Sequence, residues 1–305
     1  MDAVGRASIV VAVESDGSRL VDFARAHLAG VIASAVGPLI ARGAVARGDH
    51  PGRMDERVAV GDVITVDLDA IAPGDAIAPG CDPLVIAYED GDLIVADKPS
   101  GMHVHPLGAY RTGTLVNALL AHAGARPESP WAAWRPHTVH RLDRGASGLV
   151  LVAKRAAIHE TLRTALEAHR IVRRYEATVH GRVDAEAGTI DAPLGRDPAL
   201  DYRRAVVTDG QPAVTHYRVL ARSPAPTASA QATTRVALTL ETGRTHQLRA
   251  HLAHVGHPIV GDRLYGSPLD TGLAIALRAV TLDFLHPGNQ RPLHIAAPAG
   301  DRASS

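Results

Sequence analysis

The chain has 305 residues, of which 46% are hydrophobic, and its 32 basic and 32 acidic residues give a formal net charge of zero. That length suits one large domain plus a small one, and the zero net charge argues against a protein that binds any polyanion without selectivity. The single cysteine, Cys81, excludes an internal disulfide framework and a zinc site built from several cysteines, and we expect it to be inert. No stretch approaches the roughly 18 uncharged apolar residues of a membrane helix, so we expect a cytoplasmic protein without a membrane partner.

The first 80 residues are predicted to form a small domain. They carry seven arginines against eleven aspartates and glutamates, so this part of the chain is acidic. A helical stretch follows Ser18 and leads to an apolar segment at 58–64. Ala-Pro-Gly triplets at 72–74 and 78–80 form a turn-rich linker of the kind that separates domains. We therefore predict one domain over 1–80, linker included, and a second over 81–305.

Beyond the linker, strand-like runs alternate with a few helices, which predicts an α+β domain. Thr114 is suited to cap a helix that ends at Gly124, and apolar residues follow helical spacing over 156–169. Thr245 is expected to cap a third helix that stops at Gly256. The predicted strands are 175–180, 214–221 and 235–241, the last two joined by a hairpin loop over 223–234, and the predicted inward-facing residues of the third helix are Leu248, Leu252 and Val255.

The most informative stretch, residues 140–148, reads His-Arg-Leu-Asp-Arg-Gly-Ala-Ser-Gly and runs into an apolar segment. Asp143 lies between two guanidinium donors, on a glycine-bounded loop ahead of what reads as a fully buried strand. Opposite charges at short range favour the ionised carboxylate, so Asp143 could act as a nucleophile at neutral pH. Arg141, Asp143 and Arg144 could equally form a structural ion network, and these residues alone leave both interpretations open.

Four histidines suggest a different class of protein. His246, His251, His254 and His257 lie close together in the sequence, and the spacing of His251 and His254 could place two imidazoles on one helix face as metal ligands. A metal-dependent hydrolase is therefore one alternative. Against it, no His-Glu-x-x-His pattern is present and Asp262 is the nearest carboxylate, so we expect no metal.

The stretch around Asp143 resembles the signature of the RluA family of RNA pseudouridine synthases. That signature is His-Arg-Leu-Asp, two variable residues, Thr-Ser-Gly, and an apolar strand ending in Ala-Lys; here Ala146 stands in the threonine place. Further blocks fit the same family in the expected order, and together the resemblance covers roughly residues 83–298. The matching blocks are 88–101 with 105–106 and 113–115, then 173–175, and then 242–249 with 251–252, 256–258 and 261–266.

The resemblance implies the pseudouridine synthase fold, a mixed and mostly antiparallel central sheet flanked by helices, with the site in a central cleft. The N-terminal region looks like a degenerate form of the small RNA-binding domain of many such enzymes. The resemblance further implies that Asp143 is the nucleophile, Arg249 its salt-bridge partner and Tyr175 the aromatic group that packs on the uracil. Among RNA-contacting residues we expect Arg141 to fill the gap left by the flipped base, Arg244 to contact phosphate, and His140 and Arg144 to bind substrate. Lys154, Arg173 and Arg174 are expected to line the RNA surface.

The expected function is isomerisation of specific uridines in structured RNA to pseudouridine, without cofactor or metal. Ribosomal RNA is favoured and transfer RNA comes next, DNA is not expected as a partner, and the family suggests a monomer. The second alternative is a catalytically inactive RNA-binding protein of the same fold. It draws on Ala146, and on Arg278 where the family more usually has histidine, whereas the retention of Asp143, Tyr175 and Arg249 argues against it.

Overall fold

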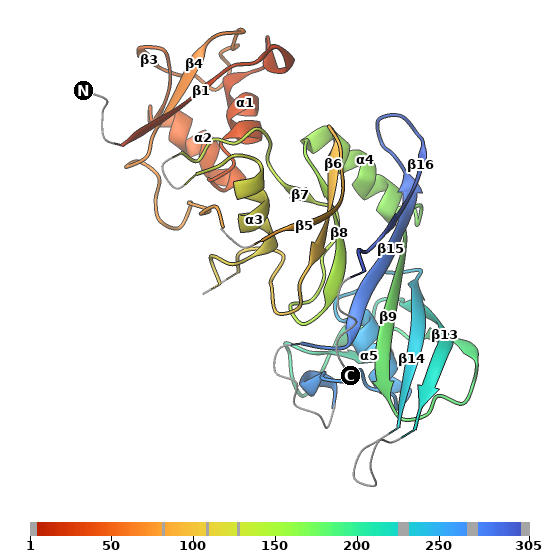
Figure 1. Ribbon diagram of the computed structural model, residues 1–305. Coiled ribbons are helices and arrows are strands. Elements are labelled where there is room, and N and C mark those ends of the chain that lie inside the picture. The colour runs from red at the N-terminus through yellow and green to blue at the C-terminus, as the bar shows by residue number, and fades with distance from the viewer. Residues whose placement is uncertain are drawn as a thin grey trace. The chain divides into compact units, whose positions relative to one another are not determined.

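A computed structural model gives the fold of this protein and describes residues 5–80, 83–107, 110–126, 129–224, 232–266 and 274–299 (Figure 1). Two structural units are present. The first comprises residues 1–84, 103–138 and 153–159, and the second comprises 85–102, 139–152 and 160–305. The domain boundary at residue 80 stays a prediction. Cys81 lies outside the described residues, as does most of the expected loop over 223–234.

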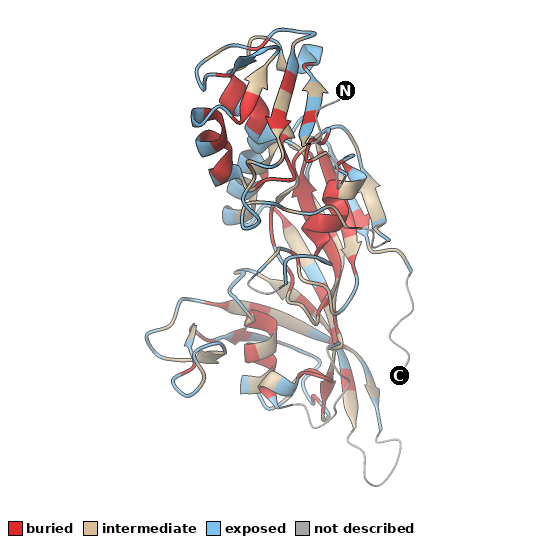
Figure 2. Cartoon of the chain, turned by 90° about the vertical axis from the view of Figure 1, so that its left-hand side faces the viewer, coloured by how far each residue is buried: buried red, intermediate tan, exposed pale blue. Residues whose placement is uncertain are grey.

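The first unit contains a four-stranded antiparallel sheet covered by two helices. The strands follow the order β1 (Arg6–Val10), β4 (Val63–Asp67), β2 (Val45–Arg47) and β3 (His50–Pro51). Helices α1 (Leu20–His27) and α2 (Ala33–Ala41) bury their apolar faces together with the inner residues of this sheet, and a 3-10 turn, η1 (Val13–Ser15), precedes them. Buried residues accordingly gather in these helices and the strands beneath them (Figure 2).

Helix α3 (Leu115–His122) of the same unit begins where the sequence predicts. The side-chain oxygen of Thr114 accepts a hydrogen bond from the backbone N–H of Asn117, and the Asn117 side chain accepts one from the backbone N–H of Thr114. This reciprocal arrangement satisfies two amides that have no partner within the helix. Gly124 follows the helix with a φ of +100°, so the predicted start and stop are both confirmed. A short strand, β7 (His137–Thr138), completes the unit.

The second unit is built on a large mixed sheet. Its strands follow the order β10 (Ala187–Asp191), β13 (Val214–Ser223), β14 (Thr233–Leu240), β9 (Val172–His180), β15 (Leu277–Leu285), β8 (Ser147–Ala153), β6 (Leu93–Lys98) and β5 (Val85–Glu89). β16 (Pro292–Ala296) pairs with β15, and β11 (Leu194–Arg196) pairs with β12 (Arg204–Val206). From β10 to β15 the neighbouring strands run antiparallel, as do β5 with β6 and β15 with β16, whereas β8 and β15 are parallel. The expected α+β class with a mostly antiparallel sheet is therefore confirmed.

The helices outside the first unit's core are α4 (Ala156–Glu167) and α5 (Gln247–His254), followed by the 3-10 turn η2 (Arg263–Tyr265). The predicted helix over 156–169 is α4, which ends two residues early. Two of the predicted strands lie within β9 and β13, and the third corresponds to β14, which ends one residue early at Leu240. No helix among the described residues is long and apolar enough to span a membrane.

The centre of the large sheet brings two distant segments together. Ala279 on β15 pairs with Gly148 of β8 on one side and with Tyr175 of β9 on the other. Gly148 has a φ of +108°, and a Cβ atom there would lie 2.2 Å from the Ala279 carbonyl oxygen, so only glycine fits this crossing. β8 is buried from Gly148 to its end, as the sequence predicts. The loop that carries Asp143 therefore leads into β8, and only β15 lies between β8 and the strand that carries Tyr175.

The start of α5 differs from the prediction. Thr245 does not cap the helix; His246 is the N-cap, and it adopts a left-handed conformation with a φ of 57° and no capping side-chain bond. The Gln247 side chain instead binds the segment before the helix, because its oxygen accepts hydrogen bonds from the Thr242 hydroxyl and the Arg244 backbone N–H. Val255 was expected to face inward with Leu248 and Leu252, but it follows the last helical residue and is 43% exposed.

Candidate active site

Asp143 meets Arg249 in the second unit. Asp143 belongs to the loop before β8, and Arg249 projects from α5; the guanidinium Nη1 donates to Asp143 Oδ2 at 3.0 Å. The Asp143 side chain keeps 19% of its surface exposed, against 12% for Arg249. The carboxylate is therefore paired but still accessible to a ligand. The salt bridge that the family resemblance implied is present in the structure, whereas the nucleophilic role of Asp143 stays a prediction.

Arg249 is held on its other edge by a second carboxylate. Its Nε donates to Asp262 Oδ2 at 2.6 Å and its Nη2 donates to Asp262 Oδ1 at 2.9 Å. Burial opposes the charge on Arg249, but the bond to Asp262 and the charges of Asp143 and Asp262 outweigh that effect and raise its pKa. Arg249 thus remains a cation whatever the pH of the assay. Sequence reasoning noted Asp262 as the carboxylate nearest the histidines and as part of the matched block 261–266, but missed this contact.

His246 also lies next to Asp143. Its Nε2 lies 3.8 Å from Asp143 Oδ1, and its Nδ1 lies 3.1 Å from the hydroxyl oxygen of Tyr265. Burial is the main cause of a lowered pKa for His246, which the charge of Asp143 partly opposes, so the imidazole is neutral at neutral pH. The sequence offered one signal for this position, namely its place within the matched block over 242–249.

Tyr175 is buried on β9, with 5% of its surface exposed. Burial raises the pKa of its hydroxyl; the nearby charge of Arg173 and a hydrogen bond with it oppose the shift, and the charge of Asp143 adds to it. Tyr175 is therefore a neutral phenol at neutral pH. Arg173 and Tyr175 lie on one face of β9, whereas Arg174 lies on the other and pairs with Asp283. Asp143, Arg249 and Tyr175, the three predicted catalytic residues, share one neighbourhood.

Lys98 binds the backbone of the loop that carries Asp143. Its side chain is fully buried, and its ammonium group donates to the carbonyl oxygens of Pro99 at 2.9 Å, Met102 at 2.9 Å and Ala146 at 2.6 Å. Because Ala146 contributes its carbonyl group to this cluster, the absent threonine hydroxyl does not interrupt the support of the loop. Arg278, the other departure from the family pattern, donates to Asp97 at 2.7 Å. Sequence reasoning assigned no role to Lys98.

The expected RNA-contacting residues are placed differently from one another. Arg141 and Arg244 are exposed, and Arg244 also donates through Nε to the Pro212 carbonyl at 3.1 Å. Arg144 is half-buried and donates to the Gly101 carbonyl at 3.0 Å. His140 is buried: its Nε2 accepts from the backbone of Leu151 at 3.2 Å, and burial lowers its pKa to about 3. That burial argues against the predicted contact between His140 and RNA.

The histidine cluster does not converge on a point. His251 is fully buried, with Nδ1 2.9 Å from the Thr215 hydroxyl and Nε2 2.9 Å from the Ala192 carbonyl oxygen. Both of its ring nitrogens are therefore engaged within the protein. His257 points elsewhere, with Nδ1 3.0 Å from the His180 carbonyl oxygen. Among the described residues no group of three His, Cys, Asp or Glu side chains is placed to hold a metal ion, so the geometry disfavours the hydrolase alternative.

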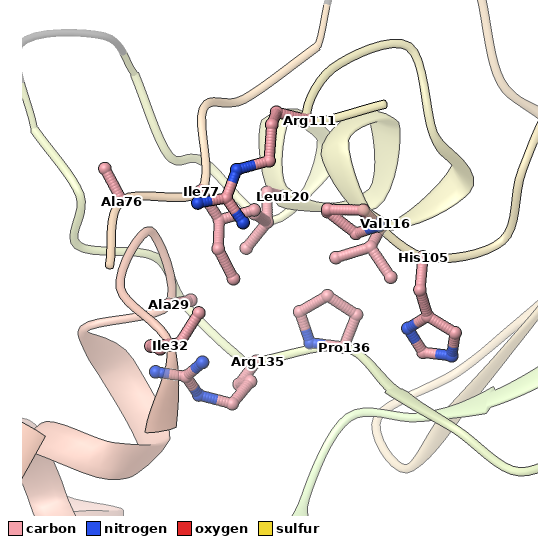
Figure 3. Close-up of a pocket in the computed structure, with 11 residues that line it drawn as sticks. Ala29, Ile32, Ala76, Ile77, His105, Arg111, Val116, Leu120, Arg135 and Pro136 are labelled. Atoms are coloured by element: carbon pink, nitrogen blue, oxygen red, sulfur yellow. The ribbon is translucent and has the colours of Figure 1, made fainter. Parts of the chain in front are cut away.

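A cavity of about 270 Å³ lies in the first unit (Figure 3). Its walls are mainly apolar and include Ile77, Val116 and Leu120, with Arg111 and Arg135 on opposite sides. Arg135 uses all three of its nitrogens on backbone carbonyls of residues 25, 28 and 31, and Arg111 bonds to the carbonyl of residue 74. Both arginines thus serve the fold, and the lining supplies no acid or nucleophile comparable to Asp143.

Comparisons with known proteins match the part of the chain that contains Asp143, Tyr175 and Arg249. The family model described as RNA pseudouridylate synthase matches residues 92–254. The chain is 41% identical over 244 residues to an uncharacterized RNA pseudouridine synthase, YlyB, of Bacillus subtilis, covering 79% of this chain and 77% of the relative. It is 40% identical over 291 residues to ribosomal large subunit pseudouridine synthase D of Xanthomonas campestris, covering 91% and 82%.

Solved structures agree with the fold. Human RNA pseudouridylate synthase domain containing 1 matches with a TM-score of 0.59 and 25% identity, over 72% of this chain and 85% of that one. Human RNA pseudouridylate synthase domain containing 4 matches with a TM-score of 0.53 and 24% identity, over 69% and 87%. Asp143, Tyr175 and Arg249 all fall within the residues that the family model matches.

Proposed function

Because this chain belongs to the RNA pseudouridine synthase family, whose members are isomerases that act on RNA, we propose that it converts uridine to pseudouridine in ribosomal RNA, with Asp143 as the catalytic carboxylate. The observation that carries the proposal is the pairing of Asp143 with Arg249 at 3.0 Å beside the buried Tyr175. The choice of ribosomal RNA draws on the relative from Xanthomonas campestris, whose similarity extends over 91% of this chain.

The reaction moves one bond without changing the composition of the nucleotide. The bond between ribose C1′ and uracil N1 breaks, a bond between C1′ and uracil C5 forms, the hydrogen on C5 leaves, and N1 gains a hydrogen. An ionised carboxylate next to the ribose serves both routes, attack on the sugar and promotion of base loss. Arg249 orients the Asp143 carboxylate through their salt bridge, and the partial exposure of Asp143 leaves it open to the ribose.

Tyr175 packs on the uracil in this proposal. Its protonated hydroxyl places no negative charge near the departing base, and its burial excludes water that would capture the detached uracil or sugar. Arg141 is exposed on the loop that carries Asp143, so its planar guanidinium can enter the base stack that the target uridine leaves.

The test is a measurement of C5 hydrogen release. Large-subunit ribosomal RNA and transfer RNA, each made with tritium on uracil C5, are incubated with the wild type, with Asp143→Asn and with the control Asp209→Asn, which changes an exposed carboxylate of the same unit. We expect tritium release from ribosomal RNA by the wild type and the control but not by Asp143→Asn, with RNA binding retained by all three. Release by Asp143→Asn at the wild-type rate would refute the role of Asp143, and release from transfer RNA alone would refute the substrate.

A further inference from the structure

Residues of one short turn contact both Arg249 and His246, which lie next to Asp143. The turn η2 follows Asp262 and ends at Gly266, whose φ of +94° closes it. We propose that residues 262–266 form a positioning element for the catalytic carboxylate, in which Asp262 fixes Arg249, Tyr265 fixes His246, and Asp143 Oδ1 is left as the oxygen that meets the ribose. This inference rests on the proposed function and assigns Asp262, Tyr265 and His246 as positioning residues rather than catalytic ones.

The contact between Asp262 and Arg249 fixes the direction of a hydrogen bond. Asp262 is 1% exposed, and each of its oxygens accepts one N–H from the same edge of the guanidinium. A planar guanidinium held by two parallel bonds cannot turn about its own axis. Its remaining nitrogen, Nη1, is therefore aimed at Asp143 Oδ2. Oδ2 is engaged by this bond, which leaves Oδ1 as the less engaged oxygen.

The contact between Tyr265 and His246 concerns the imidazole proton. The Tyr265 oxygen accepts the backbone N–H of Arg204 at 3.0 Å and lies 3.1 Å from His246 Nδ1; in this proposal the Tyr265 hydroxyl donates its proton to Nδ1. With Nδ1 as acceptor, the ring hydrogen resides on Nε2, which faces Asp143 Oδ1 at 3.8 Å. His246 Nε2 thus lies beside Oδ1 without a hydrogen bond to it, and in this proposal it leaves Oδ1 open to the ribose.

The backbone at His246 agrees with this role. A φ of 57° is uncommon for residues other than glycine, and such conformations persist where the surroundings hold them in place. Here the T-shaped contact between the His246 and Tyr265 rings, with centroids 5.9 Å apart, contributes to that hold. The charged groups that act on His246 are Asp143, Arg249, Asp262 and Arg141. Of these charges, that of Asp143 acts most strongly on His246, second only to burial.

The test uses two mild substitutions and a matched control. Asp262→Asn keeps the shape of the side chain but turns an amide group toward Arg249, and Tyr265→Phe removes one hydroxyl. Tyr202→Phe is the control, because Tyr202 is 68% exposed. The single-turnover rate of pseudouridine formation on large-subunit ribosomal RNA and the dissociation constant for that RNA are measured for each variant, together with thermal unfolding.

We expect Asp262→Asn to lower the rate about 100-fold, the effect of misplacing a catalytic group by about 1 Å. Tyr265→Phe should lower it about 10-fold, the effect of one lost hydrogen bond. The dissociation constant should stay within about twofold for both, as for the control. In the double variant with His246→Gln, Tyr265→Phe should add no further loss, because its effect passes through His246.

Four outcomes would overturn the inference. Variant rates equal to the control, with an active wild type and an inactive Asp143→Asn, would overturn the positioning element and leave the proposed function intact. Equal losses in rate and RNA binding that follow thermal instability would assign Tyr265 and Asp262 to folding alone, and additive losses in the double variant would show that Tyr265 does not act through His246. A wild type that forms no pseudouridine in any RNA, although folded, overturns the proposed function and this inference with it.

Discussion

Substitution of Lys98 by methionine should loosen the loop that carries Asp143. The Lys98 ammonium group is fully buried and donates to three carbonyl oxygens within 2.9 Å and to that of Arg144 at 3.4 Å. Lys98→Met leaves three well-bonded acceptors without this donor, at a cost of about 2 kcal/mol each. Relief from burying a charge offsets about 3 kcal/mol. The net loss is therefore about 3 kcal/mol, or about 10 °C in melting temperature for a unit of this size.

The same residue predicts a change of stability with pH. Burial lowers the pKa of Lys98 to about 8, against the opposing charges of Asp143 and Asp97. An unfolded lysine keeps its proton up to about pH 10.4. Between these values the unfolded chain binds more protons at this position than the folded chain, so the stability it contributes rises with pH from about 8 to about 10.4. Lys98→Met removes this titration, and its deficit relative to the wild type should widen by about 3 kcal/mol across that window.

The assay is urea unfolding of the wild type and Lys98→Met at pH 7, 8 and 10.4, with Lys154→Met as control. Lys154 is the one other lysine in the sequence, and its ammonium group lies 5.2 Å from the Trp134 ring, an interaction of about 1 kcal/mol. A Lys98→Met deficit under about 1 kcal/mol at pH 7, or one that stays constant from pH 8 to 10.4, would refute the reasoning.

Three further predictions follow from single residues. Gly148→Ala places a Cβ atom 2.2 Å from the Ala279 oxygen at a φ of +108°, so it should cost at least about 3 kcal/mol in thermal unfolding, and a variant as stable as the wild type would contradict the crossing of β8 and β15. Arg249→Lys removes the two-bond contact with Asp262 and should lower the single-turnover rate about 100-fold or more with RNA affinity retained; an unchanged rate would show that a point charge suffices. Burial lowers the pKa of His140 to about 3, so between about pH 6.5 and 3 the unfolded chain binds more protons at this position than the folded chain, and stability falls as the pH falls. His140→Phe should therefore make the free energy of unfolding less dependent on pH in this range. An unchanged pH dependence would contradict this prediction.

The parts of the fold that depend on local residue patterns were predictable from the sequence. Thr114 caps α3 because a hydroxyl three residues before Asn117 suffices for the contact, and the apolar run after Gly148 is buried as β8. Because 106 residues separate Asp143 and Arg249 in the chain, no local pattern predicts that they meet. Their proximity was predictable only through the family resemblance.

The remaining features depend on contacts between distant segments. The left-handed conformation of His246 and the attachment of Arg249 to Asp262 arise where α5 meets the turn η2, and no spacing along the chain encodes that meeting. The same holds for Lys98, whose bond to the Ala146 carbonyl joins residues 48 positions apart. The proline and glycine triplets before residue 80 likewise could not reveal that Trp131 donates to the Ala7 carbonyl at 3.0 Å, within one structural unit.

The central claim is that the Asp143 carboxylate isomerises uridine in ribosomal RNA. Its most direct test maps pseudouridines across the total RNA of cells that carry either the wild-type gene or one encoding Asp143→Asn. The account predicts that one or more pseudouridines in large-subunit ribosomal RNA disappear in the variant cells while the protein remains present at its normal level. An identical set of pseudouridines in the two cell lines, with the variant protein as the sole copy, would contradict it.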